Sequence, residues 1–187
     1  RPSLTPLADR LVRGGADWSR IWELKHAGGW GAFQTAGLMV SGRDALTPLH
    51  YDRHHNIFVQ VHGAKRFLLL GPEQSPNLYG FPTLHALDPL ARVELEAPSR
   101  EALIARWPRI ADARGAEVTL EPGDALIMPQ GVWHHVHSLG EENVSLSFLF
   151  ALGEGEACGA GGAQVHVGAL PPARRAAALA ELAKTME

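Results

Sequence analysis

Cysteine is almost absent from this sequence, which has one, Cys158, among 187 residues. A single thiol excludes an internal disulfide framework and indicates a reducing compartment, so we expect a cytoplasmic protein. The chain also lacks a large excess of charge of either sign, because its 17 Lys and Arg nearly balance its 20 Asp and Glu. The net charge of −3 gives no strong basic field for nucleic acid or an anionic membrane, although it does not exclude nucleic acid.

Long apolar runs are missing as well. No stretch of about 18 apolar residues occurs, and residues 1–6 lack the apolar core of a secretion signal. The sequence therefore predicts no membrane-spanning helix. The chain begins with Arg rather than Met, so we expect a processed, trimmed or partial sequence. Hydrophobic residues make up 45% of the chain, which is enough for the core of one compact domain.

Short strand patterns separated by Gly and Pro turns dominate what is present. The predicted strands are 30–34, 37–40, 47–52, 56–61, 66–70, 116–120, 125–128, 133–138 and 143–150. The turn His62-Gly63-Ala64-Lys65 predicts a tight hairpin between two of them. Such a series predicts an all-β core, either a sandwich or a jelly roll.

Short helices are predicted on both sides of a long irregular segment. Residues 17–26 predict a helix that two glycines end, and Ser99 begins a second helix that Pro108 ends. Residues 73–98 are rich in Pro and irregular. A segment of this length either shapes a groove for an extended substrate or is merely an irregular crossover.

The composition changes after residue 152. Residues 153–170 predict a Gly-rich linker, and residues 171–187 predict a terminal helix. We therefore expect residues 1–152 to form the folded domain. The terminal helix is expected to pack on that domain, and a homodimer through this helix is the alternative.

The segment Thr47-Pro48-Leu49-His50-Tyr51-Asp52 places an imidazole and a carboxylate two residues apart. Side chains alternate between the faces of a strand, so His50 and Asp52 are expected on one face, about 7 Å apart along the backbone. Two histidines and one carboxylate on one side of a metal form the facial triad of non-haem Fe(II) oxygenases. His134 is the candidate third ligand, although strand alternation alone leaves its neighbour His135 open.

Other histidines near these positions are interpreted as ordinary buried or surface side chains, because a histidine without companion ligands seldom binds metal. They are His54, His55, His62, His85, His135 and His137.

Two segments, TPLHYDRHHNIFVQVHGAKRFLLLGP and LEPGDALIMPQGVWHHVHSL, resemble the JmjC-type (cupin-8) 2-oxoglutarate oxygenases. The similarity is strongest to the asparaginyl hydroxylase that acts on hypoxia-inducible factor and to the tRNA wybutosine hydroxylases. It covers residues 38–150 and includes, in family order, the His-x-Asp pair, a spaced Asn, a Gly-x-Lys-Arg segment, a Pro-Gly-Asp turn and a Trp-His pair. The resemblance implies a double-stranded β-helix, which is a cupin-like jelly roll with Fe(II) at its mouth.

The resemblance also implies roles for individual residues. His50, Asp52 and His134 are the implied metal ligands, because the family's third ligand directly follows an aromatic residue. Lys65 is the implied partner of the distal carboxylate of 2-oxoglutarate, and Thr47 is the implied hydroxyl donor beside it.

The rest of the implied cosubstrate site follows the family pattern at one position and departs from it at two. Asn56 matches a family amide near the metal-chelating end of 2-oxoglutarate. Leu149 stands where the hydroxylase on hypoxia-inducible factor has a second Asn, and Ser147 is expected to replace that Asn in part. Neither Tyr51 nor Tyr79 matches the family tyrosine that also binds the distal carboxylate.

The implied reaction is hydroxylation of a C–H bond with Fe(II), 2-oxoglutarate and O2. A protein or peptide side chain is the expected substrate. A small molecule or a tRNA base, hydroxylated by the same chemistry, is one alternative, and a metal-binding cupin without oxygenase activity is another. Lys65 and Thr47 argue against the non-oxygenase alternative, because such a cupin has no use for a 2-oxoglutarate anchor.

Overall fold

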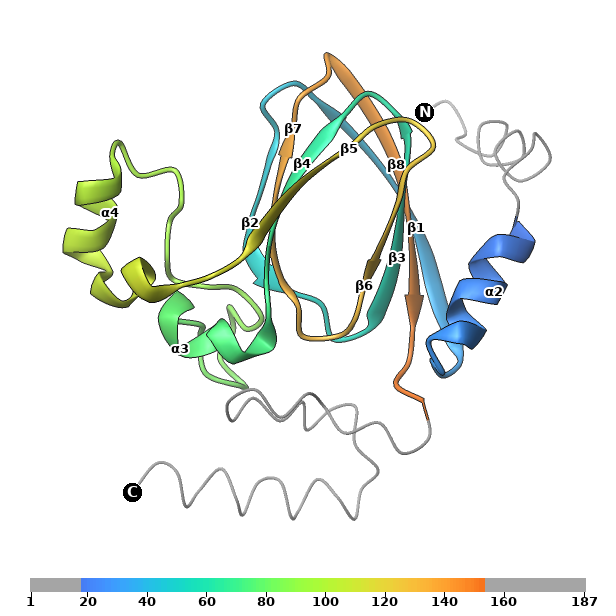
Figure 1. Cartoon of the computed structure of the whole chain (residues 1–187), viewed down its shortest axis with the longest axis horizontal. Helices are drawn as coiled ribbons and strands as arrows, with labels where there is room; N and C mark the ends of the chain where they lie inside the picture. Colours follow the sequence, from blue (N-terminus) through green and yellow to red (C-terminus); the bar gives the residue numbers. More distant parts are fainter. Residues whose placement is uncertain (1–17, 154–187) are drawn as a thin grey trace, which may run out of the picture.

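A computed structural model describes residues 18–153 as two four-stranded antiparallel sheets that face each other (Figure 1). The first sheet has the strand order β1-β8-β3-β6, and the second has the order β2-β7-β4-β5. The strands are β1 (Phe33–Gly42), β2 (Leu46–Tyr51), β3 (His55–His62), β4 (Lys65–Leu70), β5 (Ala116–Leu120), β6 (Ala125–Met128), β7 (Trp133–Ser138) and β8 (Glu142–Phe150). This is the expected all-β, cupin-like jelly roll.

Alternation along the strands divides the apolar residues between the space within the barrel and its outer faces. Phe58 of the first sheet meets Phe67 of the second edge to face, with ring centroids 4.9 Å apart. They belong to an inner cluster that also contains Leu120, Met128 and Val136. This cluster joins the two sheets, since it draws residues from both.

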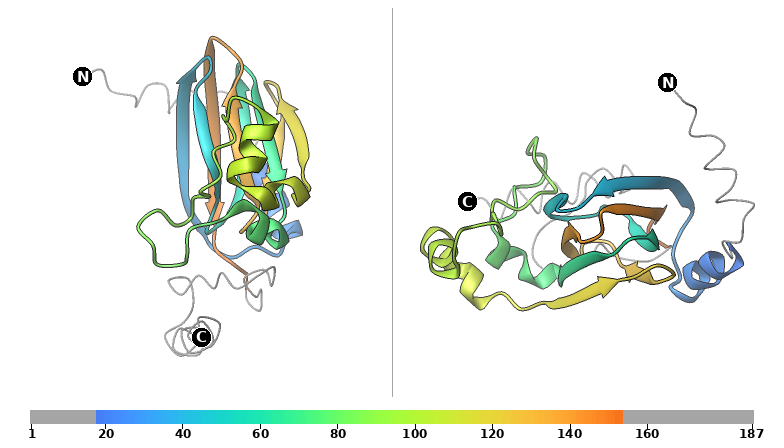
Figure 2. Two further views of the ribbon diagram at one scale, coloured as in Figure 1. Left: turned by 90° about the vertical axis from the view of Figure 1, so that its left-hand side faces the viewer. Right: turned by 90° about the horizontal axis from the view of Figure 1, so that it is seen from above.

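One helix covers the outer face of the first sheet. Helix α2 (Trp18–Ala27) packs Ile21 against Ile57, Phe148 and Phe150, which project outward from the sheet. Figures 1 and 2 show this helix beside β1, on the side of the barrel away from α4 (Arg100–Arg106). Helix α2 therefore covers the part of the outward face around Ile57, Phe148 and Phe150, whereas Ile127 on the same face is 46% exposed.

The connection from β4 to β5 covers the second sheet. It contains the 3₁₀ helix Pro72–Gln74, α3 (Ser75–Leu78), α4 and the 3₁₀ helix Pro108–Asp112. The outward-facing Leu49, Tyr51, Leu70 and Trp133 pack with Leu78 of α3. As predicted, Ser99 begins α4, and its hydroxyl accepts a hydrogen bond from the backbone N–H of Ala102 at 3.1 Å.

The predicted hairpin between β3 and β4 is wrong. The two strands are consecutive and joined by a tight turn, but they lie in opposite sheets. β3 pairs with β8 and β6, whereas β4 pairs with β7 and β5. Gly63, at φ +69°, makes the turn, and a Cβ there would lie 2.2 Å from the Glu142 carbonyl oxygen. The same short turn that suits a hairpin thus crosses from one sheet to the other.

The remaining expectations differ less. The two predicted pieces 30–34 and 37–40 form one strand, β1, with an irregularity between Phe33 and Thr35. The predicted terminal helix and nearly all of the predicted linker lie outside residues 18–153, and the domain boundaries stay predictions. None of the helices in the described part of the chain has the length and apolar character needed to cross a bilayer.

Candidate metal centre

An irregularity in β2 brings two of the predicted site residues to the inner face. Thr47 pairs with Val136 of β7, and His50 pairs with His134, so β2 uses one residue more than β7 between these two pairs. Pro48 lies in this bulge, as is usual for proline in a strand, because it cannot donate to the sheet ladder. Thr47 and His50 consequently share the inner face although they are three residues apart.

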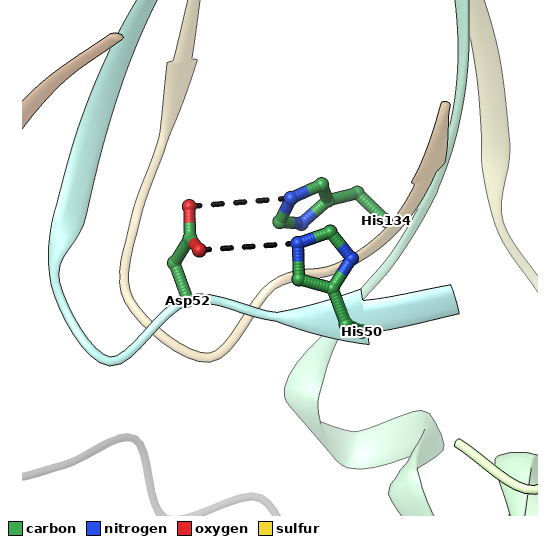
Figure 3. Close-up of side chains that lie close together, drawn as sticks. All are labelled: His50, Asp52 and His134. Carbon is green, nitrogen blue, oxygen red and sulfur yellow. Dashed lines mark ion pairs between the residues drawn. The ribbon is translucent and has the colours of Figure 1, made fainter. Parts of the chain in front are cut away.

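His50, Asp52 and His134 lie together at the end of β2 (Figure 3). Nε2 of His50 is 4.0 Å from Oδ1 of Asp52, and Nε2 of His134 is 4.0 Å from Oδ2 of the same carboxylate. All three candidate ligand atoms lie within 4.8 Å of one another. The sequence predicted that strand alternation would bring Asp52 beside His50. Instead, β2 ends at Tyr51, and Asp52 reaches this position from the connection to β3.

Backbone carbonyls determine which nitrogen each histidine presents. Nδ1 of His50 lies 2.8 Å from the Pro48 carbonyl oxygen, and Nδ1 of His134 lies 3.0 Å from that of Val132. A carbonyl only accepts, so each Nδ1 carries the proton and donates it. In the neutral form of each ring, Nε2 is then the unprotonated nitrogen and faces Asp52, which is the tautomer that a metal ligand requires.

Burial also keeps His134 uncharged. Its surroundings, together with the nearby His50, lower the pKa of His134 to about 4, and Asp52 opposes that shift. At neutral pH the imidazole is therefore the neutral form that binds metal, with no proton to displace.

A short chain of hydrogen bonds supports Asp52. Asn56 donates from Nδ2 to Oδ2 of Asp52 at 2.9 Å, and Ser147 donates from its hydroxyl to Oδ1 of Asn56 at 2.8 Å. The backbone carbonyl of Asp52 accepts from the N–H of Gly131 at 3.1 Å. The described contacts of Asn56 and Ser147 therefore orient the carboxylate, and their predicted contact with the cosubstrate stays a prediction.

These residues fit a divalent metal. Ligands at about 2.1 Å from a metal, at right angles to one another, lie about 3 Å apart. Closing the 4.0 Å separations to that value requires movements of about 1 Å. The donor set of two imidazoles and one carboxylate occupies one side of the position between them, and it suits Fe(II) among the first-row metals.

Lys65 projects into the barrel from the start of β4 and is buried, with 5% of its surface exposed. Its Nζ donates to the Ser145 hydroxyl of the opposite sheet at 3.0 Å and lies 5.4 Å from the centre of the Phe58 ring. Among residues 18–153, no carboxylate forms an ion pair with it. Burial accordingly lowers the pKa of Lys65. A buried ammonium without an anionic partner is costly, so this position suits an anionic ligand.

The other predicted anchor is less enclosed. Thr47 is exposed on β2, opposite Val136, which in turn pairs with Phe67 of β4. Lys65 occupies the inward-facing position of β4 that comes just before Phe67. None of the hydrogen bonds found among the described residues joins Thr47 to Lys65, so the structure brings them to one inner surface without direct contact.

A family model described as a cupin-like domain (cupin-8) matches residues 13–152. The chain belongs to the cupin-8 (JmjC) family. Among curated proteins, it is 36% identical over 93 residues to Jumonji C domain-containing protein 5 of Drosophila melanogaster, covering 50% of this chain and 22% of that protein. It is 34% identical to HSPB1-associated protein 1 of Rattus norvegicus, covering 65% and 25%, and 35% identical to Lysine-specific demethylase 8 of Danio rerio, covering 57% and 25%. The chain thus spans about a quarter or less of these relatives.

Solved structures of cupin proteins also match. The cupin domain of Drosophila melanogaster CENP-C matches with a TM-score of 0.37 and 8% identity, over 62% of this chain and 59% of that one.

Three other histidines of this cupin-like domain contact groups outside the candidate centre. His135, the open alternative to His134, is on the outer face of β7, where its Nε2 contacts a Glu96 carboxylate oxygen. His137 on the same face contacts Asp44 at 3.1 Å. His55 stacks on Trp30 with ring centroids 4.5 Å apart. The one group of ligand-type side chains that lies close enough to hold a metal, within residues 18–153, is His50, Asp52 and His134.

Sequence reasoning missed one buried carboxylate beside the centre. Asp88 accepts from the Tyr51 hydroxyl at 2.6 Å and from Nη2 of Arg53 at 2.8 Å. Burial and the bond to Asp88 both raise the pKa of Tyr51, so this phenol remains a donor. No sequence pattern links Asp88 to residues more than thirty positions away, and a long irregular segment gives no register from which to infer the contact.

Proposed function

We propose that this cupin-like domain is an Fe(II)- and 2-oxoglutarate-dependent oxygenase that hydroxylates a C–H bond, with a protein or peptide side chain as substrate. The carrying observation is the pairing of the His50, Asp52 and His134 cluster with the buried ammonium of Lys65 in one barrel. The triad accounts for a metal, and the buried ammonium, which has no ion pair within residues 18–153, accounts for a dicarboxylate cosubstrate. Membership of the cupin-8 family, and the names of its JmjC relatives, support the same class of chemistry.

Each residue has a defined task in this proposal. His50 and His134 would hold the metal through Nε2, and Asp52 would hold it through its carboxylate. Lys65 holds the distal carboxylate of 2-oxoglutarate, with the Thr47 hydroxyl on the same inner surface. When bound, Fe(II), 2-oxoglutarate and O2 supply the oxidising power for the C–H bond, and the cosubstrate leaves as succinate and CO2. The protein fixes geometry and limits water at the centre.

The irregular segment of residues 73–98, which borders His50, supports the proposal of a polymeric substrate. Residue Leu90 of this segment forms a β-bridge with His50. Two apolar side chains of the same segment are exposed, Leu84 at 73% and Leu87 at 46%. Because they lie in the segment that contacts His50, these side chains are suited to contact an extended polypeptide bound next to the candidate centre. The substrate is proposed on this basis, with a small molecule or a tRNA base as the alternative.

Demethylation is the second candidate function. Two relatives are named as lysine-specific demethylases, and oxidation of an N-methyl C–H bond belongs to the same chemistry. A non-oxygenase cupin remains the competing class, and it predicts metal binding without any use of Lys65.

The decisive experiment is anaerobic titration of the protein with Fe(II) and 2-oxoglutarate. We expect a visible charge-transfer band that appears only when both are present, followed by succinate on admission of O2. His134→Ala should abolish both signals, whereas the matched variant His135→Ala, which alters the neighbouring residue on the opposite face, should retain them. Metal binding without the band would favour the non-oxygenase cupin, and equal loss in both variants would refute the assignment of His134.

A further inference from the structure

Residues 80–91 form an arm that adds to the outer edge of β2. This strand lies at the edge of its sheet, so its outer backbone groups are free for another segment. The N–H of Ala91 donates to the Leu49 carbonyl at 2.8 Å, and the N–H of Tyr51 donates to the Pro89 carbonyl at 3.3 Å. The arm is thereby joined to the end of β2 that carries the candidate metal ligands.

Asp88 connects the same arm to side chains on both sides of Asp52. Its carboxylate is buried, with 1% of the side chain exposed. Oδ1 accepts from the Tyr51 hydroxyl at 2.6 Å, and Oδ2 accepts from Nη2 of Arg53 at 2.8 Å. The same nitrogen of Arg53 lies 3.3 Å from the Asp88 backbone carbonyl. A single carboxylate therefore holds the residue before and the residue after a candidate ligand.

The location of Asp52 makes this connection consequential. Asp52 follows the last residue of β2 and precedes β3, so no ladder of strand hydrogen bonds fixes its backbone. Its direction depends on the Asn56 side chain, on the N–H of Gly131 and on the two residues that Asp88 holds. A carboxylate that must meet two imidazoles within about 1 Å is sensitive to such support.

We propose that Asp88 is a positioning residue for the metal centre, which aligns Asp52 by holding Tyr51 and Arg53 and so couples the arm to the metal ligands. The proposal rests on the metal site proposed above. It also makes the arm, whose exposed Leu84 and Leu87 are the proposed substrate contacts, part of the structure that supports the metal.

Asp88→Asn keeps the size of the side chain but removes its negative charge and replaces one acceptor oxygen with an NH2 donor. The amide oxygen can still accept from Tyr51, but the charge-assisted bond to Arg53 is lost. We expect this variant to bind metal about 10-fold more weakly, the lower end of the effect usual for residues that orient ligands. Tyr51→Phe and Arg53→Gln each remove one of the two bonds, and we expect each to weaken metal binding by a smaller factor.

Co(II) is the probe, because its visible absorption reports both affinity and ligand geometry. The full chain is titrated after chelator treatment, at a temperature where each variant is folded by circular dichroism. Ser99→Ala is the matched control, since it removes the cap of α4 and touches none of the candidate ligands. It should lower the melting temperature while leaving the Co(II) affinity and band shape unchanged. Asp88→Asn should lower the affinity and alter the band shape.

The outcomes separate the two proposals. If Asp88→Asn binds Co(II) as tightly as the wild type with the same spectrum, Asp88 has no positioning role and the metal site stands. If the wild type binds no Co(II), or binds it equally well after His134→Ala, both proposals fail. If Asp88→Asn does not fold, Tyr51→Phe and Arg53→Gln decide, and unchanged Co(II) affinity in both overturns the role of Asp88.

Discussion

Lys65→Met is expected to stabilise the ligand-free protein while abolishing 2-oxoglutarate binding. The effective penalty for burying an isolated charge is several kcal/mol. Here the Ser145 hydroxyl at 3.0 Å and the Phe58 ring at 5.4 Å offset part of it, by about 1–3 kcal/mol together. Met fills a similar volume without charge, and the Ser145 hydroxyl that it leaves unpaired reduces the gain. We expect a net stabilisation of about 1–2 kcal/mol, or about 2–8 °C in Tm.

The effect should depend on pH in a defined direction. Because burial lowers the pKa of Lys65, the unfolded chain binds more protons than the folded protein between that value and the ordinary pKa of about 10.4. The stability of the wild type should therefore rise with pH through this alkaline window. Lys65→Met has no such group and should lack the rise.

Urea unfolding and the anaerobic Fe(II) and 2-oxoglutarate band together measure both effects. Lys25→Met is the matched control, because it removes the other lysine in residues 18–153, on α2 and away from the barrel interior. It should change neither the alkaline slope nor the band. A Lys65→Met protein that is less stable than the wild type and keeps its alkaline slope would refute the reasoning about buried charge. One that retains the band would refute the cosubstrate role.

Two further predictions concern the metal ligands. The pKa of His134, lowered to about 4, means that the metal-free protein should lose stability as pH falls from about 6.5 toward 4, by about 3 kcal/mol in total, because only the unfolded chain is protonated there. Denaturant unfolding at several pH values should show this loss in the wild type, and the same dependence in His134→Gln would contradict it. Asn56→Ala removes the donor to Asp52 and should weaken Co(II) binding about 10- to 100-fold, whereas Gln34→Ala, on exposed β1, should leave it unchanged in the same titration.

Regular strands could be predicted closely from the sequence. The bounds predicted for β5, β6 and β7 are those observed, since short apolar runs between Gly and Pro turns are local signals. The β3–β4 turn was interpreted wrongly because Gly63 suits either a hairpin or a crossing between sheets, and the choice depends on which strands arrive later in the chain.

For the candidate site, the sequence predicts which residues belong to it but not how they are positioned. The three clustered residues follow from the motif and from family resemblance, whereas the geometry behind them does not. Alternation alone would place Thr47 and His50 on opposite faces, and only the bulge at Pro48 corrects this. The support of Asp52 by Asn56, and the contacts of Asp88, arise from tertiary packing that leaves no periodic trace in the sequence.

The pairing of β2 with β7 has a consequence for folding. His50 and His134 are direct partners in that pairing, yet more than eighty residues separate them in the chain. Closing so long a loop lowers the entropy of the chain before any stabilising contact has formed. We therefore expect this non-local pairing to form slowly during folding. A metal held at both histidines would close that loop, so the time at which the refolding chain takes up metal would report the formation of the β2–β7 pairing.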